Sequence, residues 1–167
     1  WSLSKRISYS LILFSLFIAF MSCSNDSNVV VIAKDFSEEQ WSRFEYLQAD
    51  FKVDRAPVEH DIVMEVLVSD IFPNVYEAHQ EESALSFNLT ITNPDDNGFR
   101  SRNYNFNLKD KDGNWKAEKK NGYYHYKLPI INGMTFSEEG VYKFQIENKY
   151  SKEPLYGIKS LTLKCIN

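Results

Sequence analysis

The chain has 167 residues, of which 19 are basic and 23 acidic, giving a formal net charge of −4 at pH 7. Nucleic-acid binding requires a clustered basic excess, so this composition disfavours that class of function. The 12 Phe and 10 Tyr residues favour strands, and the 2 cysteines are too few for a disulfide framework.

The N-terminal residues have the pattern of a bacterial lipoprotein signal. Two basic residues precede an uncharged run over residues 7–20, and Ser22 then stands directly before Cys23. A basic start, an apolar run and a small residue at the cut are typical of a secretory signal. We expect a signal peptide over residues 1–22, followed by the lipidated cysteine and a polar tether over residues 23–28. The lipids would be a diacylglycerol on the Cys23 sulfur and a fatty acyl chain such as palmitate on its amino group.

Two alternatives to lipidation remain open. An ordinary signal peptide cut near Ser22 would leave a free thiol, and an uncleaved anchor helix would need about 20 apolar residues. The polar residues 24–28 reach only about 17 Å when fully extended. A lipid-anchored domain over residues 29–167 is therefore expected to lie close to the membrane.

The sequence pattern predicts the first element of this domain clearly but not the second. Residues 29–32 predict a strand, whereas residues 36–51 are ambiguous. Ser37 followed by Gln40 has the form of a helix capping box. Apolar residues also recur at helical spacing, at Trp41, Phe44, Leu47 and Phe51. Phe44 and Tyr46 alternate with Glu45, however, as residues of a strand do. We expect a short helix or an irregular segment there, leading into a strand near residues 51–53.

Alternation of apolar and polar residues predicts the remaining strands. The clearest covers residues 85–92, and others are expected over 62–68, 103–109, 115–117, 124–128, 142–146 and 161–165. Turn clusters at residues 93–98, 112–113, 121–122 and 154–157 separate them. About eight short strands without helix–strand alternation predict an all-β fold. We expect a single antiparallel β-sandwich of jelly-roll or immunoglobulin-like type.

No pattern in the sequence predicts catalysis. The three histidines, His60, His79 and His125, show no metal-ligand spacing, and there is no nucleophile elbow or glycine-rich phosphate loop. Residues 110–114 are expected to form a hairpin turn rather than a calcium loop. Cys165 is expected to be a small core residue. We therefore expect no enzyme activity, no metal and no cofactor.

A cluster of aromatic residues offers an alternative function. Trp115, Tyr123, Tyr124 and Tyr126 would form a platform that stacks on sugar rings, although such aromatics more often belong to a core. On this hypothesis the chain is a surface glycan-binding lipoprotein.

A series of landmarks in fixed order and spacing points to a known family. They are Arg102, Tyr104, Phe106, Asp112, Gly113, Trp115, Gly122, Tyr124, Leu128, Pro129, Phe136, Gly140, Tyr142, Phe144, Glu147, Leu155, Gly157 and Ile158. Phe36 and Trp41 also fit. With these residues the chain resembles the gliding-motility lipoprotein H family of the Bacteroidetes, the GldH-like lipoproteins.

This resemblance implies an outer-membrane lipoprotein that supports the gliding apparatus and its type IX secretion system. Such a protein is expected to be non-enzymatic and to bind other envelope proteins. Surface-exposed lipoproteins of this phylum often carry several acidic residues after the cysteine, whereas here Asp26 is the only acid in residues 24–28. We therefore expect the periplasmic face of the outer membrane rather than the cell surface.

Overall fold

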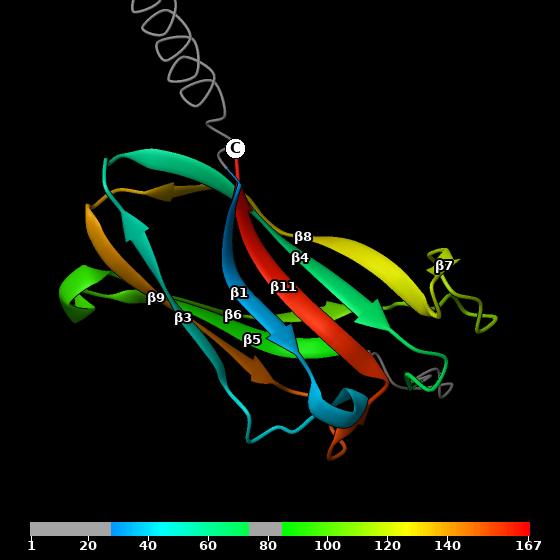
Figure 1. Cartoon of the computed structure of the whole chain (residues 1–167). Coiled ribbons are helices and arrows are strands. Elements are labelled where there is room, and N and C mark those ends of the chain that lie inside the picture. The colour runs from blue at the N-terminus through cyan, green and yellow to red at the C-terminus, as the bar shows by residue number, and fades with distance from the viewer. Residues whose placement is uncertain (1–27, 74–84) are drawn as a thin grey trace, which may run out of the picture.

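The computed structural model describes residues 28–73 and 85–167, whose long strands form two antiparallel sheets packed face to face (Figure 1). In chain order the long strands are β1 (Val29–Asp35), β3 (Leu47–Val53), β4 (Val58–Val68), β5 (Leu85–Thr92), β6 (Phe99–Phe106), β8 (Tyr123–Phe136), β9 (Gly140–Asn148) and β11 (Ile158–Ile166). The short elements are η1 (Ser37–Glu39), β2 (Gln40–Trp41), η2 (Pro94–Asp96), β7 (Lys119–Lys120) and β10 (Leu155–Tyr156). The first sheet has the order β1-β11-β4-β8-β7 and the second the order β3-β9-β5-β6.

The long strands pair from the ends of the domain inwards. Among the eight long strands of the described residues, β1 pairs with β11, β3 with β9, β4 with β8, and β5 with β6. The first long strand thus pairs with the last, the second with the seventh, the third with the sixth and the fourth with the fifth. This nested pairing, as if one long hairpin were folded over, is the jelly-roll arrangement. The expected all-β sandwich is therefore confirmed, and its connectivity is that of a jelly roll.

One face of each sheet is apolar, and the two apolar faces form the core. In β5 the side chains of Phe87, Leu89 and Ile91 are no more than 2% exposed, because alternate residues of a strand point to opposite faces. Cys165 is fully buried in the same core, and burial raises the pKa of its thiol to about 12. The expectation that Cys165 is a core residue is thus confirmed.

Residues 36–51 contain no α-helix. Only the 3-10 turn η1 forms, because Glu38 and Glu39 have φ angles of 56° and 53°, a conformation that cannot continue a right-handed helix. The capping-box interpretation of Ser37 is wrong, since Phe36 holds the position before the turn and no side chain caps it. Trp41 is instead fully buried and extended, through the pairing of β2 with β10.

Two further predictions need correction in the region of β7 and β8. Trp115 forms only an isolated bridge to Lys109 rather than a strand over residues 115–117. Strand β8 continues beyond Pro129 to Phe136. Beyond the short pairing with β7, β8 is the edge of its sheet, where a proline is tolerated because half of the N–H groups face away from the ladder.

The turns expected at residues 112–113 and 121–122 are present, whereas the turn expected over residues 154–157 contains the short strand β10. Asn121 and Gly122 have φ angles of 52° and 86°, the left-handed pair that a two-residue hairpin between β7 and β8 requires. Asp110 accepts hydrogen bonds at Oδ1 from the backbone N–H groups of Asp112 and Asn114, at 2.9 and 2.8 Å. Residues 110–114 are therefore a turn closed by its own aspartate.

The two ends of the sandwich differ in what they carry. Val29 pairs with Cys165, so the start of β1 and the end of β11 lie together at one end, which we call the proximal end (Figure 1). β1 leads from there to η1 and β2 at the opposite, distal end. The nine residues of β11 span about 30 Å at roughly 3.3 Å per residue. No helix in residues 28–73 or 85–167 is long and apolar enough to cross a bilayer.

Candidate interaction surfaces

Across residues 28–73 and 85–167 the structure brings together no metal site. No three His, Cys, Asp or Glu side chains lie close enough there to hold an ion. His60 packs edge-on against the rings of Phe51 and Phe136, with centroids 5.7 and 5.9 Å away, and is buried in the core. His79 and the proposed lipid site Cys23 lie outside the described residues.

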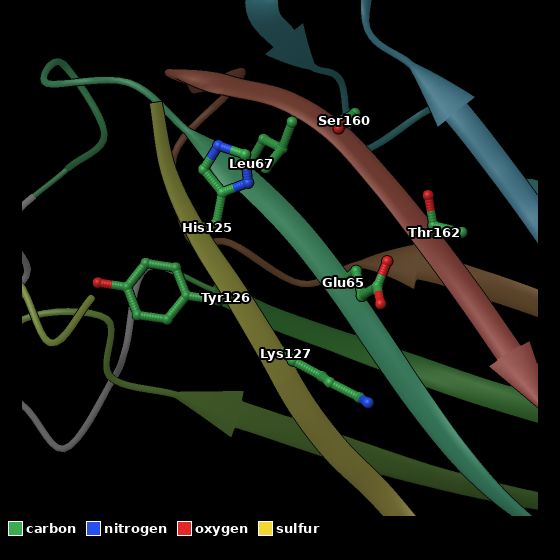
Figure 2. Close-up of a pocket in the computed structure, with 7 residues that line it drawn as sticks. All are labelled: Glu65, Leu67, His125, Tyr126, Lys127, Ser160 and Thr162. Carbon is green, nitrogen blue, oxygen red and sulfur yellow. The ribbon is translucent and has the colours of Figure 1, made fainter. Parts of the chain in front are cut away.

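A shallow hollow of about 400 Å³ lies on the outer face of the first sheet. Figure 2 shows its lining, in which His125 lies beside Leu67 on the neighbouring strand and Tyr126 points away from them. The hydroxyl of Ser160 on β11 is separated from His125 on β8 by the whole of β4, so these two strands are about 10 Å apart. His125 Nε2 instead contacts the carbonyl of Lys120 at 3.2 Å. The hollow therefore contains no serine–histidine pair for nucleophilic chemistry.

The aromatic residues singled out in the sequence do not form one platform. Trp115 and Tyr124 stack on each other, with ring centroids 4.0 Å apart and planes inclined by 14°. The ammonium of Lys109 lies 4.3 Å from the centroid of the Trp115 ring, so that face is covered by a cation–π contact. With Tyr124 against the other face, neither side of the indole is open for stacking on a sugar.

The hydroxyls of the other two tyrosines are both hydrogen-bonded within the domain. The hydroxyl of Tyr126 donates a hydrogen bond to the carbonyl of Leu108, and that of Tyr123 donates to the carboxylate of Glu39. The hydrogen bond to Glu39 raises the pKa of Tyr123. Tyr123 and Tyr124 are neighbours on β8 and so lie on opposite faces of the sheet. Tyr126, two residues after Tyr124, lies on the same face as Tyr124, so the structure separates only Tyr123 from the other aromatics.

A different aromatic feature projects from the distal end. Residues 42–46, which we call the aromatic loop, connect β2 to β3 and carry Phe44 and Tyr46. The side chain of Phe44 is 77% exposed and that of Tyr46 is 50% exposed. A groove of about 370 Å³ beside them is lined in part by Arg43 and Tyr150. An exposed phenylalanine next to a groove is typical of a protein-binding surface.

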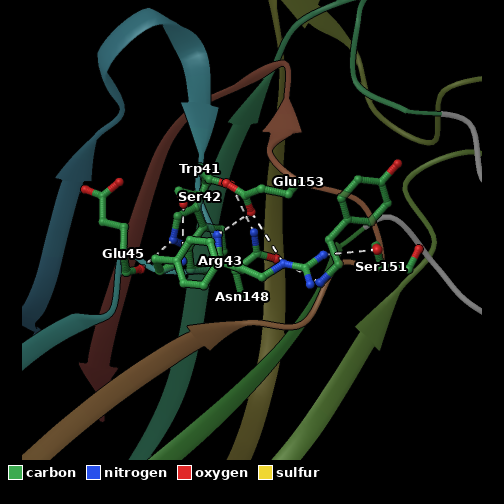
Figure 3. Close-up of polar contacts among 9 residues, drawn as sticks. Trp41, Ser42, Arg43, Glu45, Asn148, Ser151 and Glu153 are labelled. Carbon is green, nitrogen blue, oxygen red and sulfur yellow. Dashed lines mark hydrogen bonds and ion pairs between the residues drawn. The ribbon is translucent and has the colours of Figure 1, made fainter.

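The aromatic loop is held by hydrogen bonds within itself (Figure 3). The indole Nε1 of Trp41 donates to the carbonyl of Glu45 at 2.9 Å, and the backbone N–H of Glu45 donates to the carbonyl of Ser42 at 3.1 Å. The N–H of Phe44 donates to the hydroxyl of Ser42 at 3.2 Å. From β1, Lys34 forms an ion pair with Glu45 at 2.6 Å. These contacts fix the backbone from which Phe44 projects.

The neighbouring loop between β9 and β10 also contacts the aromatic loop (Figure 3). The carboxylate of Glu153 accepts a hydrogen bond from the backbone N–H of Arg43 at 2.8 Å, and this bond is the main cause of the lowered pKa of Glu153. The guanidinium of Arg43 donates to the carbonyl of Ser151 at 3.1 Å. The amide of Asn148, almost fully buried, donates to the carbonyl of Trp41 at 3.0 Å. The two loops therefore form one rigid unit.

This surface is not predicted from the sequence, because the helical spacing places Phe44 on the apolar side of a helix. The other three residues of that pattern, Trp41, Leu47 and Phe51, are no more than 6% exposed. The signal that separates Phe44 from them is its immediate context, since it stands between the charged residues Arg43 and Glu45. A strand-like alternation around Phe44 and Tyr46 was visible but competed with the helical spacing.

Comparison with known families bears on the whole domain. Residues 28–165 match the family model described as GldH lipoprotein. The match runs from just before β1 almost to the end of β11, so it includes both sheets and both ends of the sandwich. It confirms the resemblance found in the sequence. No curated protein matches the chain.

Proposed function

The chain belongs to the GldH lipoprotein family, and from this premise we propose that it is a non-enzymatic accessory component of a gliding-motility or type IX secretion apparatus. It would act by binding another envelope protein while a lipid on Cys23 holds it to the outer membrane. The observation that carries the binding proposal is the rigid aromatic loop with its exposed Phe44.

Membrane attachment at Cys23 would determine which end of the domain faces a partner. The tether between Cys23 and Val29 reaches about 17 Å, and Val29 lies at the proximal end of the sandwich. The distal end would stand about 30 Å further from the bilayer, given the length of β11. We propose that the domain faces the periplasm, where this distal end would meet the other components of the apparatus.

Phe44 has the properties of a binding hot spot. Burying a phenylalanine side chain in an apolar pocket contributes about 2–3 kcal/mol, and Phe44 has most of its surface available for such burial. Because the loop is already fixed by Trp41, Ser42 and Glu153, little conformational entropy would be lost on binding. A flexible loop carrying the same residue would bind more weakly for that reason.

The proposal is tested by substituting Phe44→Ser in the full-length chain in its host. The tagged protein is extracted in mild detergent, and co-purified proteins are identified by mass spectrometry. We expect the wild type to enrich motility or secretion components and the variant to lose them, together with gliding and secretion. Val141→Ser is the matched control, because Val141 is also an exposed apolar residue, at 41%, but lies near the proximal end.

Two results would contradict the proposal. One is recovery of the same partners with Phe44→Ser as with Val141→Ser. The other is a gene deletion that leaves gliding and secretion intact in a host that has both. Membrane attachment is tested separately, because Cys23→Ala should move the protein from the membrane fraction to the soluble periplasm. That measurement does not depend on the partner.

A further inference from the structure

The outer face of the second sheet carries a band of uncharged polar side chains. Strand pairing places four of them in one row across all four strands, because Gln48 is opposite Gln145, Gln145 opposite Thr90, and Thr90 opposite Ser101. Paired residues point to the same side of a sheet. Asn88 and Asn103 form part of the next row. We call this set the amide face: Gln48, Gln145, Thr90, Ser101, Asn88 and Asn103.

Side chains of the amide face are hydrogen-bonded to one another. Asn88 Nδ2 donates to the hydroxyl of Ser101 at 3.0 Å and to Asn103 Oδ1 at 2.9 Å. The hydroxyl of Thr90 donates to Asn88 Oδ1 at 2.8 Å. Across the other pair of strands, Gln48 Nε2 donates to Gln145 Oε1 at 3.0 Å. These hydrogen bonds, which we call the ladder, fix the side-chain rotamers. A carboxamide has two donor and two acceptor positions. Asn88 uses all four within the ladder, whereas Asn103, Gln48 and Gln145 keep positions that can face a ligand.

Two hollows and an exposed aromatic ring lie beside the ladder. A hollow of about 390 Å³ lies on one side of it, beside Lys143, and another of about 240 Å³ lies on the other side, beside Lys149. Both lysines form ion pairs, with Asp96 at 3.8 Å and with Glu147 at 3.3 Å respectively. Phe99 is opposite Thr92 and so lies on this same face, where it is 72% exposed.

We propose that the amide face binds a neutral polysaccharide. A sugar polymer offers hydroxyl donors and acceptors at every ring, which match fixed amides and hydroxyls, and the C–H face of a ring packs against an aromatic such as Phe99. The charges next to the amide face are of both signs, since Lys143 is opposite Asp50 and Lys149 pairs with Glu147, so a charged polymer would meet repulsion as well as attraction. An apolar protein surface would bury the amides without hydrogen bonds, which is unfavourable. This site is separate from the aromatic loop and goes beyond the function proposed above.

The jelly-roll fold by itself does not carry this inference, since one fold supports many unrelated functions. What carries it is a fixed, uncharged hydrogen-bonding surface next to an exposed aromatic ring. We therefore place sugar binding at the amide face and not at Trp115, because Tyr124 and Lys109 cover the two faces of the Trp115 ring.

The test is affinity electrophoresis of the full-length protein in native gels. The protein is extracted in a polyoxyethylene detergent, because detergents with sugar headgroups would compete for the site. The gels contain dextran, mannan, laminarin or the neutral polysaccharide fraction of the host envelope, with alginate as the anionic control. We expect retardation in at least one neutral gel and none in alginate.

Two variants localise the binding. Asn103→Asp places a charge on the face but keeps the Oδ1 acceptor that Asn88 uses, and we expect binding weakened about tenfold or more. Its matched control is Asn132→Asp, the same charge change at an exposed residue of β8 in the other sheet, which should bind as the wild type does. Phe99→Ser removes an exposed ring without disturbing the core and should also weaken binding.

Several outcomes would overturn the proposal. They are an absence of retardation in every neutral gel, retardation in alginate alone, and binding to purified peptidoglycan sacculi but to no neutral polysaccharide. Equal binding by Asn103→Asp, Phe99→Ser and Asn132→Asp would also overturn it. Loss of partner proteins in Phe44→Ser reports on the aromatic loop, so failures of the two proposals are distinguishable.

Discussion

Substitution of Asn148 by alanine should destabilise the domain more than any change to a surface amide. Asn148 is 3% exposed, and its side chain makes two hydrogen bonds to backbone groups. Nδ2 donates to the carbonyl of Trp41 at 3.0 Å, and Oδ1 accepts from the N–H of Tyr150 at 2.9 Å. Each backbone group left unpaired in the interior costs about 1–3 kcal/mol. The expected loss for the two groups is therefore about 2–6 kcal/mol, a large part of the roughly 5–15 kcal/mol by which such domains are stable.

Equilibrium urea unfolding followed by circular dichroism measures this loss, and thermal unfolding should show a decrease in Tm on the order of 10 °C. Asn132→Ala is the matched control, because Asn132 is exposed and its substitution should change stability by no more than about 0.5 kcal/mol. If Asn148→Ala were as stable as Asn132→Ala, the two buried bonds would not hold the aromatic loop. The rigidity on which the Phe44 proposal relies would then have no structural basis.

Three further predictions concern the core, a close backbone contact and pH. Gly157→Ala should lower the free energy of unfolding by about 3 kcal/mol or more, because at φ +80° the added Cβ would lie 2.4 Å from the backbone nitrogen of Phe72. Gly122→Ala is the control: it also has a positive φ, +86°, but nothing lies within 4 Å of the added Cβ, so it should lower that free energy by only about 1–2 kcal/mol. Equal unfolding midpoints for the two variants would contradict the close contact at Gly157. The thiol of Cys165, with a pKa of about 12, should resist iodoacetamide in the native protein and react in guanidinium chloride, as read by mass spectrometry. Glu153 has a pKa lowered below 4.5, chiefly by the backbone N–H of Arg43, so its contribution to stability is present above that pH and is lost as the pH falls through the folded-state value. Glu153→Gln should therefore have a lower Tm than the wild type at neutral pH, and the difference in Tm should shrink as the pH falls through the folded-state pKa of Glu153.

The fold could be predicted where the residue pattern has one interpretation. Residues 85–92 alternate without interruption and end at a turn cluster, and β5 has those bounds. Residues 36–51 offered two periods at once, and the structure adopts neither over the whole segment. The conformation of this segment is determined by the burial of Trp41 and the pairing of β2 with β10, which brings together residues far apart in the sequence. A local pattern contains no information on such a partner.

The surfaces were harder to predict than the strands. Tyr123 precedes the strand predicted over residues 124–128. Its place on the opposite face to Tyr124 follows only from the structure, in which β8 begins at Tyr123. The amide face could not be foreseen, because Gln48 and Ser101 are brought into one row only by the pairing of β3, β9, β5 and β6. Neutral polar residues in one strand resemble an ordinary solvated face. Only the register shows that they continue across the whole sheet.

The two proposed sites are arranged so that a lipid-anchored chain would use both at once. The aromatic loop projects from the distal end, whereas the amide face runs across the strands on the side of the sandwich. Attachment near Val29 would leave that side roughly perpendicular to the membrane and the distal end pointing away from it. A polysaccharide against the side would therefore leave Phe44 accessible to a protein partner. The two surfaces adjoin at Lys149 and Ser151, which line both the groove beside the aromatic loop and the smaller hollow beside the amide face. Binding at one surface should therefore weaken binding at the other for a ligand that covers these two residues.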